Sequence, residues 1–279
     1  MKKTLSLGVL ALALFSARPA LAETEPVKMW RLDCGSLVVS NFGVFSDAGA
    51  FEGEKRAMTD SCYLIKHGSD YMIWDTGLDG ALKGKTVTQW VFTISLQETI
   101  IDQLARIGVK SDQIGIVGLS HLHDDHTGQA RDFPKAKLLL GKGDLDAFRA
   151  APATGGPLDP ARVKPWLTGG STAEGVSGDK DVFGDGSVMM LNMSGHTAGH
   201  HVLLVRLPKT GPVLLSGDLF HSQANFDREE VPSFNADRAD TLASFDRFKK
   251  LAVALKAKVI IQHEPADVAK LPAFPAAAE

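Results

Sequence analysis

A cluster of histidines constrains this chain more than any other feature of its sequence. Residues 120–128 read Ser-His-Leu-His-Asp-Asp-His-Thr-Gly, so three of the nine histidines fall within six residues. Imidazole and carboxylate groups are the ligands that hold a hydrolytic divalent metal while leaving positions open for water and substrate. In an extended chain His121 and His123 point the same way, and a turn would bring Asp125 and His126 to a second position nearby. The spacing predicts the start of two adjacent metal sites rather than a lone core histidine.

The hydrophobic pattern around this cluster is that of an α/β protein. An apolar strand predicted over residues 114–119 leads directly into the histidines. Helices are predicted over 97–108, 143–150 and 240–256, and further strands over 27–32, 37–40, 62–66, 71–74, 136–140, 188–193, 202–207, 212–216 and 259–262. Residues 41–60 and 151–186 are predicted to be irregular. Two strand-rich halves, each with helices, predict a four-layer αββα sandwich.

The first residues have the pattern of a secretory signal peptide. Two lysines precede an apolar stretch over residues 5–15, and Ala20-Leu-Ala22 supplies the small residues that a signal peptidase recognises. We expect residues 1–22 to be removed, leaving one domain over 23–279 that is periplasmic or secreted and has no membrane attachment. The alternative is an uncleaved anchor, but the apolar stretch is short for a bilayer span. A net charge of −3 and the lack of a basic run give no reason to expect a nucleic-acid partner.

The chain has two cysteines, Cys34 and Cys62. Export would permit a disulfide, and both cysteines lie on or beside predicted early strands. The alternative, which we favour on the sequence alone, is a pair of buried thiols that act as small apolar residues. Neither cysteine belongs to a CxxC pair, so the sequence predicts no cysteine metal site.

Three later segments extend the resemblance of this chain to the metallo-β-lactamase superfamily, whose HxHxDH motif is matched over residues 121–126. Gly195-His196-Thr197 resembles the family's second histidine element, Ser216-Gly-Asp218 its bridging aspartate, and Gln262-His263-Glu264 its last histidine. Each segment follows an apolar stretch that is predicted to be a strand. The combination is specific, whereas any one of the later segments alone would be weak.

The resemblance implies a complete set of ligands for two divalent metal ions. One ion would be held by His121, His123 and His196, the other by Asp125, His126 and His263, with Asp218 as the bridge. Zinc is the expected metal, with cobalt, manganese and iron as alternatives that such ligands also accept. The two ions would share a hydroxide at neutral pH, and this hydroxide would attack the substrate. His200 would have an outer role, and His67 and His201 structural ones.

Within the superfamily the chain is most similar to the N-acyl-homoserine lactone lactonases, which open a lactone ring and quench bacterial signalling. The bridging Asp218 argues against β-lactamases, and His123 in place of glutamate argues against the diiron reductases. Glyoxalase-II-like thioesterases extend well beyond their last histidine ligand, whereas this sequence has 16 residues after His263. Many lactonases carry tyrosine three residues after the bridging aspartate, where this chain has His221. The resemblance implies that His221 hydrogen-bonds the substrate carbonyl and that Asp125 passes a proton to the departing alkoxide. Alternatively, His221 marks a different substrate or is a surface histidine just past a strand.

Three phenylalanines in the irregular segment, Phe42, Phe45 and Phe51, would contact an acyl tail, or else are ordinary core residues. Two related activities remain alternatives, hydrolysis of phosphotriesters by a secreted enzyme and hydrolysis of thioesters. A non-enzymatic alternative is a periplasmic zinc-binding protein. Relatives of this kind are often homodimers, so a second copy is an expected partner beside the small lactone.

Overall fold

The computed structural model describes residues 26–152 and 158–279, which form two β-sheets with helices on their outer faces. The expected signal peptide at 1–22 lies outside the described residues. The larger sheet has the strand order β4 (Lys85–Gln89), β5 (Phe92–Leu96), β1 (Val27–Val39), β2 (Arg56–His67), β3 (Asp70–Trp74), β6 (Ile114–Gly118), β7 (Lys137–Gly141) and β8 (Ala173–Val176). The smaller sheet has the order β13 (Lys258–Ile260), β12 (Gly211–Leu215), β11 (His201–Leu207), β10 (Val188–Asn192) and β9 (Lys180–Asp181).

The helices are mostly short, and α6 is the longest in the described part of the chain. The α-helices are α1 (Ile100–Arg106), α2 (Asp124–Thr127), α3 (Lys142–Ala150), α4 (Lys164–Leu167), α5 (Gln223–Arg228), α6 (Arg238–Leu255) and α7 (Pro265–Val268). Short 3-10 helices are η1 (Phe42–Phe45), η2 (Gly80–Leu82), η3 (Ser111–Gln113), η4 (Ala130–Asp132), η5 (Pro160–Val163) and η6 (Gly217–Leu219). Among the described residues, no helix combines the length and the apolar character that a membrane crossing requires.

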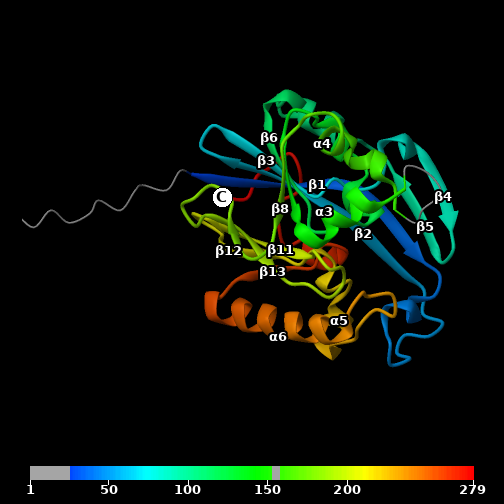
Figure 1. Ribbon diagram of the computed structural model, residues 1–279. Coiled ribbons are helices and arrows are strands. Elements are labelled where there is room, and N and C mark those ends of the chain that lie inside the picture. Colours follow the sequence, from blue (N-terminus) through cyan, green and yellow to red (C-terminus); the bar gives the residue numbers. More distant parts are fainter. Residues whose placement is uncertain (1–25, 153–157) are drawn as a thin grey trace, which may run out of the picture.

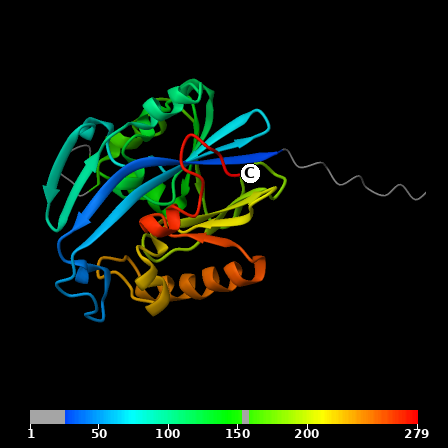
Figure 2. The same cartoon turned by 180° about the vertical axis from the view of Figure 1, so that it is seen from behind.

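Alternating side chains of the strands build three apolar layers, which confirms the predicted αββα sandwich. Between the sheets, Met72 and Trp74 of β3 pack against side chains such as Leu203 of β11. On the outer face of the larger sheet, residues such as Ile73 of β3 pack beneath α1, α3 and α4. On the outer face of the smaller sheet lies α6, which contributes Phe245. Figures 1 and 2 show α6 along one side of the molecule and α3 and α4 on the opposite side.

The structure changes several predicted boundaries. The two strands expected over 27–32 and 37–40 are one strand, β1, with an irregularity between Asp33 and Gly35. Strand β2 begins at Arg56, so the irregular segment is shorter than expected and contains η1. The hairpin β4–β5 was not predicted at all. The described part of residues 151–186 contains η5, α4, β8 and β9, of which β8 joins the larger sheet and β9 the smaller one.

Candidate metal centre and substrate pocket

The residues expected to bind metal come together at one edge of the two sheets. His121, His123, Asp125 and His126 follow β6 of the larger sheet. The remaining three follow strands of the smaller sheet: His196 comes after β10, Asp218 lies in η6 after β12, and His263 comes after β13. The side chains form two groups, and within each group the ligand atoms lie within 4.8 Å of one another. The first group consists of His121, His123, His196 and Asp218, and the second of Asp125, His126 and His263. Each group therefore draws on both sheets.

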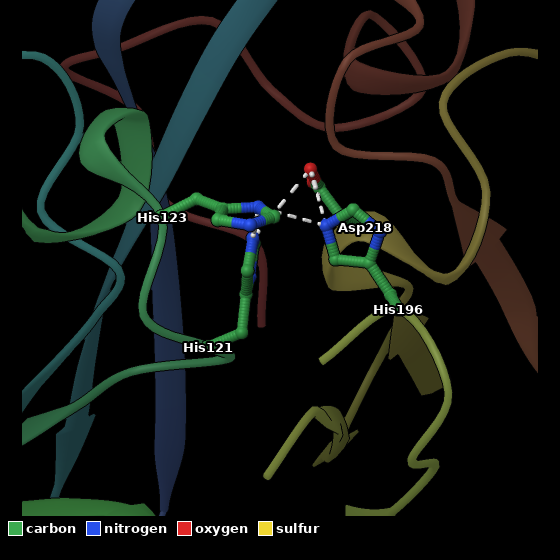
Figure 3. A group of neighbouring side chains, drawn as sticks. All are labelled: His121, His123, His196 and Asp218. Atoms are coloured by element: carbon green, nitrogen blue, oxygen red, sulfur yellow. Dashed lines mark hydrogen bonds and ion pairs between the residues drawn. The ribbon is translucent and has the colours of Figure 1, made fainter. Parts of the chain in front are cut away.

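The first group is a cluster of three imidazoles and one carboxylate, shown in Figure 3. Nδ1 of His123 lies 2.9 Å from Nε2 of His121 and 2.9 Å from Nε2 of His196. Oδ2 of Asp218 lies 3.7 Å from Nε2 of His121 and 3.4 Å from Nε2 of His196. Two nitrogens bound to one zinc at about 2.0–2.1 Å in tetrahedral geometry would be about 3.3 Å apart. The four atoms therefore converge at a spacing close to that of a metal site.

The second group faces the other oxygen of Asp218. Oδ1 of this carboxylate lies 3.0 Å from Nε2 of His126 and 2.9 Å from Nε2 of His263. The carboxylate of Asp125 lies 3.9 Å from the same nitrogen of His126 and 3.8 Å from that of His263. Asp218 thus presents one oxygen to each group, which is the arrangement of a carboxylate shared between two cations.

A cation at each group fits the chemistry of these residues. Oδ1 of Asp218 is buried and has no hydrogen-bond partner in the part of the chain that the structure describes, although two imidazole nitrogens lie close to it. Such an orphaned acceptor is rare in a protein interior. A divalent cation between the carboxylate and the imidazoles would satisfy all of them at once. The donor set of five imidazoles and two carboxylates is one that zinc accepts.

The two groups differ in their electrostatics. Burial lowers the pKa of His121 and of His196 well below the ordinary value. The two rings are therefore neutral, and each has one nitrogen with a lone pair that can bind a cation. Burial would also lower the pKa of His263, but the Asp218 carboxylate raises it to about 9. For His126 burial is likewise outweighed by Asp218 and Asp75, which raise its pKa well above the ordinary value. A cation in the second group must therefore displace protons from the imidazoles.

Several ligand side chains are oriented by residues that sequence reasoning missed. Nδ1 of His196 donates to Oδ1 of Asn235 over 2.8 Å, and Nδ1 of His263 donates to the carbonyl of Thr59 over 2.8 Å. These bonds fix the ring so that Nε2 faces the centre. His200 holds Asp218 in turn, because its Nε2 accepts the backbone N–H of Asp218 over 3.0 Å. The expected outer role of His200 therefore has a geometric basis.

Asp75 supports the centre from the end of β3. Its Oδ2 accepts Nδ1–H of His126 over 3.0 Å, and its Oδ1 accepts the backbone N–H of Ser120 over 2.7 Å. Asp75 is fully buried and has a positive φ of 57°. A residue other than glycine in this region of φ is uncommon and is kept where its surroundings require it. Here the surroundings are the loop that carries four of the ligands.

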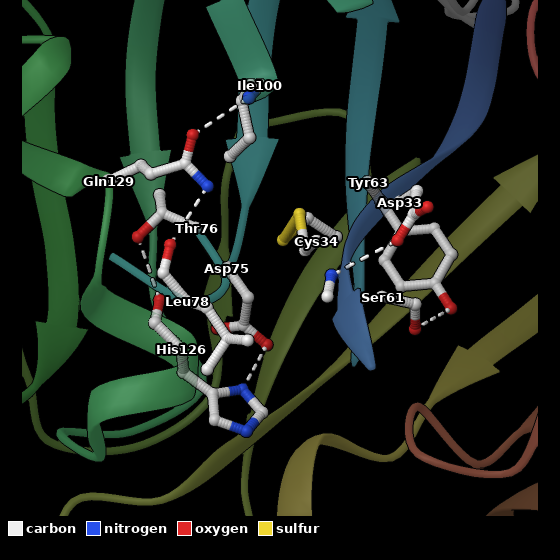
Figure 4. Close-up of a disulfide and its surroundings, with 12 residues drawn as sticks. Asp33, Cys34, Ser61, Tyr63, Asp75, Thr76, Leu78, Ile100, His126 and Gln129 are labelled. Carbon is white, nitrogen blue, oxygen red and sulfur yellow. Dashed lines mark hydrogen bonds and ion pairs between the residues drawn. A yellow bond between two sulfur atoms is a disulfide. The ribbon is translucent and has the colours of Figure 1, made fainter. Parts of the chain in front are cut away.

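Cys34 and Cys62 form a disulfide, so the thiol pair that we favoured from the sequence is wrong. Both residues are buried, and Figure 4 shows the bridge beside the turn that carries Asp75 and Thr76. Gly77 in this turn has a φ of 62°, and a Cβ there would lie 2.4 Å from Cβ of Cys34. The bridge therefore packs directly against the turn that supports the ligand loop.

His67 and His201 have the structural roles that were expected. Nε2 of His67 lies 2.8 Å from Oδ2 of Asp185, and the His67 ring stacks on Phe183. The ring nitrogens of His201 lie 2.8 Å from the carbonyl of Gly199 and 3.0 Å from that of Gly178. Neither histidine belongs to the two ligand groups.

The two groups of candidate metal-binding side chains lie at the floor of a cavity of about 630 Å³. Its lining from the centre includes His123, Asp125, Asp218, His221 and His263, with Asp124 beside them. Its walls are mostly apolar and comprise Leu37, Phe45, Met58, Leu78, Gln89, Trp90, Phe92, Ile94, Leu122, Leu158 and Phe234. No lysine or arginine is among the described residues that line it. The cavity suits an uncharged, largely apolar ligand.

The three phenylalanines of the irregular segment separate in the structure. Phe45 lines the cavity, whereas Phe42 and Phe51 are buried behind it in an apolar cluster with Val39. Phe42 stacks on Phe45 with 4.5 Å between ring centroids. Of the three, only Phe45 is therefore positioned to contact a ligand in the cavity. The hairpin β4–β5, absent from the prediction, supplies more of the wall, including Trp90, which is 68% exposed.

His221 lies where the lactonase resemblance is weakest, and it faces both the centre and the cavity. Its Nε2 lies 3.0 Å from Oδ2 of Asp218. Because a carboxylate only accepts, this nitrogen carries a proton. Nδ1 of His221 is buried and has no hydrogen-bond partner among the described residues. In a neutral ring that nitrogen is an acceptor, and it donates only when the ring is an imidazolium.

The sequence of this chain matches a family model and is similar to proteins of known name. The family model described as the metallo-beta-lactamase superfamily matches residues 58–263. The N-acyl homoserine lactonase AttM of Azorhizobium caulinodans is 26% identical over 249 residues, which cover 86% of this chain and 94% of that protein. The AttM protein of Rhizobium radiobacter is 32% identical over 181 residues, which cover 62% of this chain and 68% of that protein.

Solved structures of similar fold include other lactonases. A quorum-quenching N-acyl homoserine lactone hydrolase has a TM-score of 0.75 at 22% identity, and the match covers 91% of this chain and 98% of the other. AidC, a dizinc quorum-quenching lactonase, has a TM-score of 0.66 at 18% identity, covering 92% and 91% of the two chains. The family model spans most of the domain and reaches from the pocket wall at Met58 to the last ligand at His263, and the chain belongs to the metallo-beta-lactamase superfamily.

Proposed function

We propose that this chain is a dinuclear-metal hydrolase that opens the ring of uncharged lactones, and that N-acyl-homoserine lactones are its substrates. One observation carries the proposal. Asp218 faces two complete groups of metal-binding side chains, and these lie at the floor of an apolar cavity that no described cationic side chain lines. A β-lactam or a glutathione thioester carries carboxylates, which such a wall would not neutralise. The names of the relatives support the same substrate, because they are N-acyl homoserine lactonases.

Two divalent cations held by these groups would activate a water and polarise the carbonyl that it attacks. The chain's own residues then place and protonate the substrate. Asp125 is a partly exposed carboxylate at the cavity floor, next to His126 and His263. We assign it to pass a proton to the alkoxide that leaves when the ring opens. Because it belongs to the second group and also lines the cavity, it can reach both solvent and product.

His221 orients the substrate through Nδ1. The Asp218 carboxylate fixes the ring by accepting Nε2–H, so a neutral ring presents the lone pair of Nδ1. An acyl-homoserine lactone has one amide N–H next to its ring, and we infer that Nδ1 accepts this N–H. The expected hydrogen bond from this position to the substrate carbonyl would instead need an imidazolium. Both roles stay predictions, and they differ in the substrates they would affect.

The acyl tail would lie between the hairpin β4–β5 and the aromatic side chains opposite it. Trp90 and Phe92 lie 5.6 Å apart, centroid to centroid, and Phe45 lies 5.4 Å from Phe234. All four side chains line the cavity. Burial of each methylene of a tail against such a wall stabilises the complex by up to about 0.8 kcal/mol. We therefore expect a preference for longer acyl chains.

The test is a hydrolysis panel with the zinc-loaded protein. It compares N-acyl-homoserine lactones, a simple γ-lactone, an uncharged phosphotriester, a glutathione thioester and a β-lactam. The expected result is the highest kcat/KM for the acyl-homoserine lactones, with no turnover by the Asp218→Ala protein. A higher kcat/KM for the phosphotriester, which the apolar cavity also fits, would reassign the substrate. Two bound zinc ions without turnover of any compound would leave a zinc-binding protein.

We also propose that the protein is exported to the periplasm or secreted after removal of residues 1–22. The signal-peptide pattern supports this, and so does the disulfide between Cys34 and Cys62, since disulfides persist mainly in oxidising compartments. Cell fractionation and the N-terminal sequence of the mature protein test it. An intact N-terminus in a cytoplasmic fraction would contradict it.

A further inference from the structure

A buried carboxyl group outside the ligand set has no partner of its own. Asp60 of β2 is 1% exposed. Neither of its carboxylate oxygens has a hydrogen-bond partner among the described residues. Burying a carboxylate without a partner is strongly unfavourable, and buried acids in proteins are normally paired, hydrogen-bonded or close to a metal. Without a bound cation nearby, the buried carboxyl group of Asp60 should therefore destabilise the folded protein.

Asp60 follows a residue that contacts the candidate metal centre. The preceding residue, Thr59, is bonded to His263 twice, through its carbonyl to Nδ1 over 2.8 Å and through its backbone N–H to the carbonyl of His263 over 3.2 Å. Two residues earlier on the same face of the strand, Met58 lines the cavity. Asp60 is thus on the strand that contacts the candidate ligand His263, two residues from a side chain that lines the cavity.

The charges that act on Asp60 belong to the centre or to its support. Burial raises the pKa of Asp60 well above its ordinary value, and Asp125 raises it further. The only cationic groups among the main influences are the imidazoles of His263 and His126, which lower it. No lysine or arginine is among these main influences in the described structure. Among these main influences, positive charge therefore reaches Asp60 from the ligand groups.

We propose that Asp60 is an outer carboxylate of the metal centre, whose charge the bound cations balance and whose role is to raise their affinity. Five neutral imidazoles and two carboxylates leave two divalent cations with an excess of positive charge in a buried place. Asp75 reduces this excess through its hydrogen bond to His126. Asp60 reduces it from strand β2, without being a ligand. The proposal rests on the two-metal centre of the proposed function and not on its substrate.

This role predicts opposite effects of one substitution on two measurements. Asp60→Asn keeps the shape of the side chain and removes its charge. The metal-free variant should unfold at a higher temperature than the metal-free wild type, by about 3 °C, because an unpaired acid has been removed. Its zinc affinity should fall by about tenfold to a hundredfold, the range seen when outer-shell partners of metal ligands are replaced. A residue with a purely structural role would not separate the two measurements in this way.

The experiment measures both quantities on the full mature protein, with Asp33→Asn as the matched control. Asp33 lies on the neighbouring strand β1 and takes no part in the centre. Zinc affinity is measured by competition with a chelating dye, and unfolding by circular dichroism after chelation. A second variant, Asp60→Val, removes the buried polar atoms and should show the same two signs.

Unchanged zinc affinity in Asp60→Asn would overturn the proposal, and so would a metal-free variant that is less stable than wild type. Wild-type protein that binds no zinc would overturn both this proposal and the two-metal centre. Wild-type protein that binds two zinc ions but hydrolyses no lactone would contradict only the proposed substrate. In that case weaker zinc binding by Asp60→Asn would still support the role of Asp60.

Discussion

Replacement of His221 by phenylalanine separates two roles for this residue. The ring of His221 is 2% exposed and packs on Phe45 with 4.6 Å between centroids, so phenylalanine should fit the same space. The substitution removes Nδ1, which we propose accepts the amide N–H of the substrate. A buried donor left without its acceptor costs about 1–3 kcal/mol. We therefore expect kcat/KM for an N-acyl-homoserine lactone to fall by about tenfold to a hundredfold.

The assay compares this substrate with a γ-lactone of equal chain length that has no amide. The γ-lactone offers Nδ1 no N–H, so its kcat/KM should change by less than about twofold. Because Nε2 of His221 also bonds Asp218, the zinc content of the variant is measured alongside and should match wild type. Equal losses for both substrates would refute the amide contact and favour action at the ring carbonyl. No loss for either would mean that His221 touches no substrate.

Four further changes test other parts of the structure. Asp218→Ala should lower bound zinc below two ions per chain and reduce kcat by at least about a hundredfold; full activity would contradict a shared carboxylate. Trp90→Ala should leave the unfolding temperature unchanged, because the side chain is 68% exposed. It should lower kcat/KM by a larger factor for substrates with longer acyl chains, and an equal effect at every chain length would contradict a contact between Trp90 and the acyl tail. Reduction of Cys34–Cys62, which are separated by 28 residues in sequence, should lower the free energy of unfolding by about 3.5 kcal/mol in urea titrations; matching curves with and without reductant would contradict this. Asn235→Ala should weaken zinc binding by about tenfold or more in dye competition, whereas Asn235→Asp, which keeps the acceptor for His196, should not.

The metal-binding residues could be predicted to different degrees. His121, His123, Asp125 and His126 are close in sequence, so their spacing alone indicates a metal site. His196, Asp218 and His263 are far apart, and only the resemblance to a known family links them to the motif. Supports such as Asn235 and the carbonyl of Thr59 leave no spacing pattern, because they act across elements that meet only in the folded chain.

The cavity wall was predicted less well than its floor. Residues 85–96 contain β-branched residues typical of strands, but the tight turn has no glycine or asparagine, and Trp90 takes the positive φ of 52° instead. Strand β4 is exposed along its whole length, so the hydrophobic alternation that reveals a buried strand is absent. Phe42 and Phe51 are a different case, because the sequence left a ligand wall and a core role both open for them, and they lie in the core. Their apolar side chains suit a ligand wall or a core equally well, and only the fold decides between the two.

The two ligand groups also connect the halves of the molecule mechanically. Each group joins side chains that follow β6 of one sheet to side chains that follow β10 or β13 of the other. A cation bound by either group would therefore act as a cross-link between the two sheets, and its binding free energy would add to the stability of the sandwich. Once free zinc exceeds its dissociation constant, each tenfold rise in zinc should add about 1.4 kcal/mol per site to the free energy of unfolding. The supply of metal would then govern how long this protein persists as well as how fast it works.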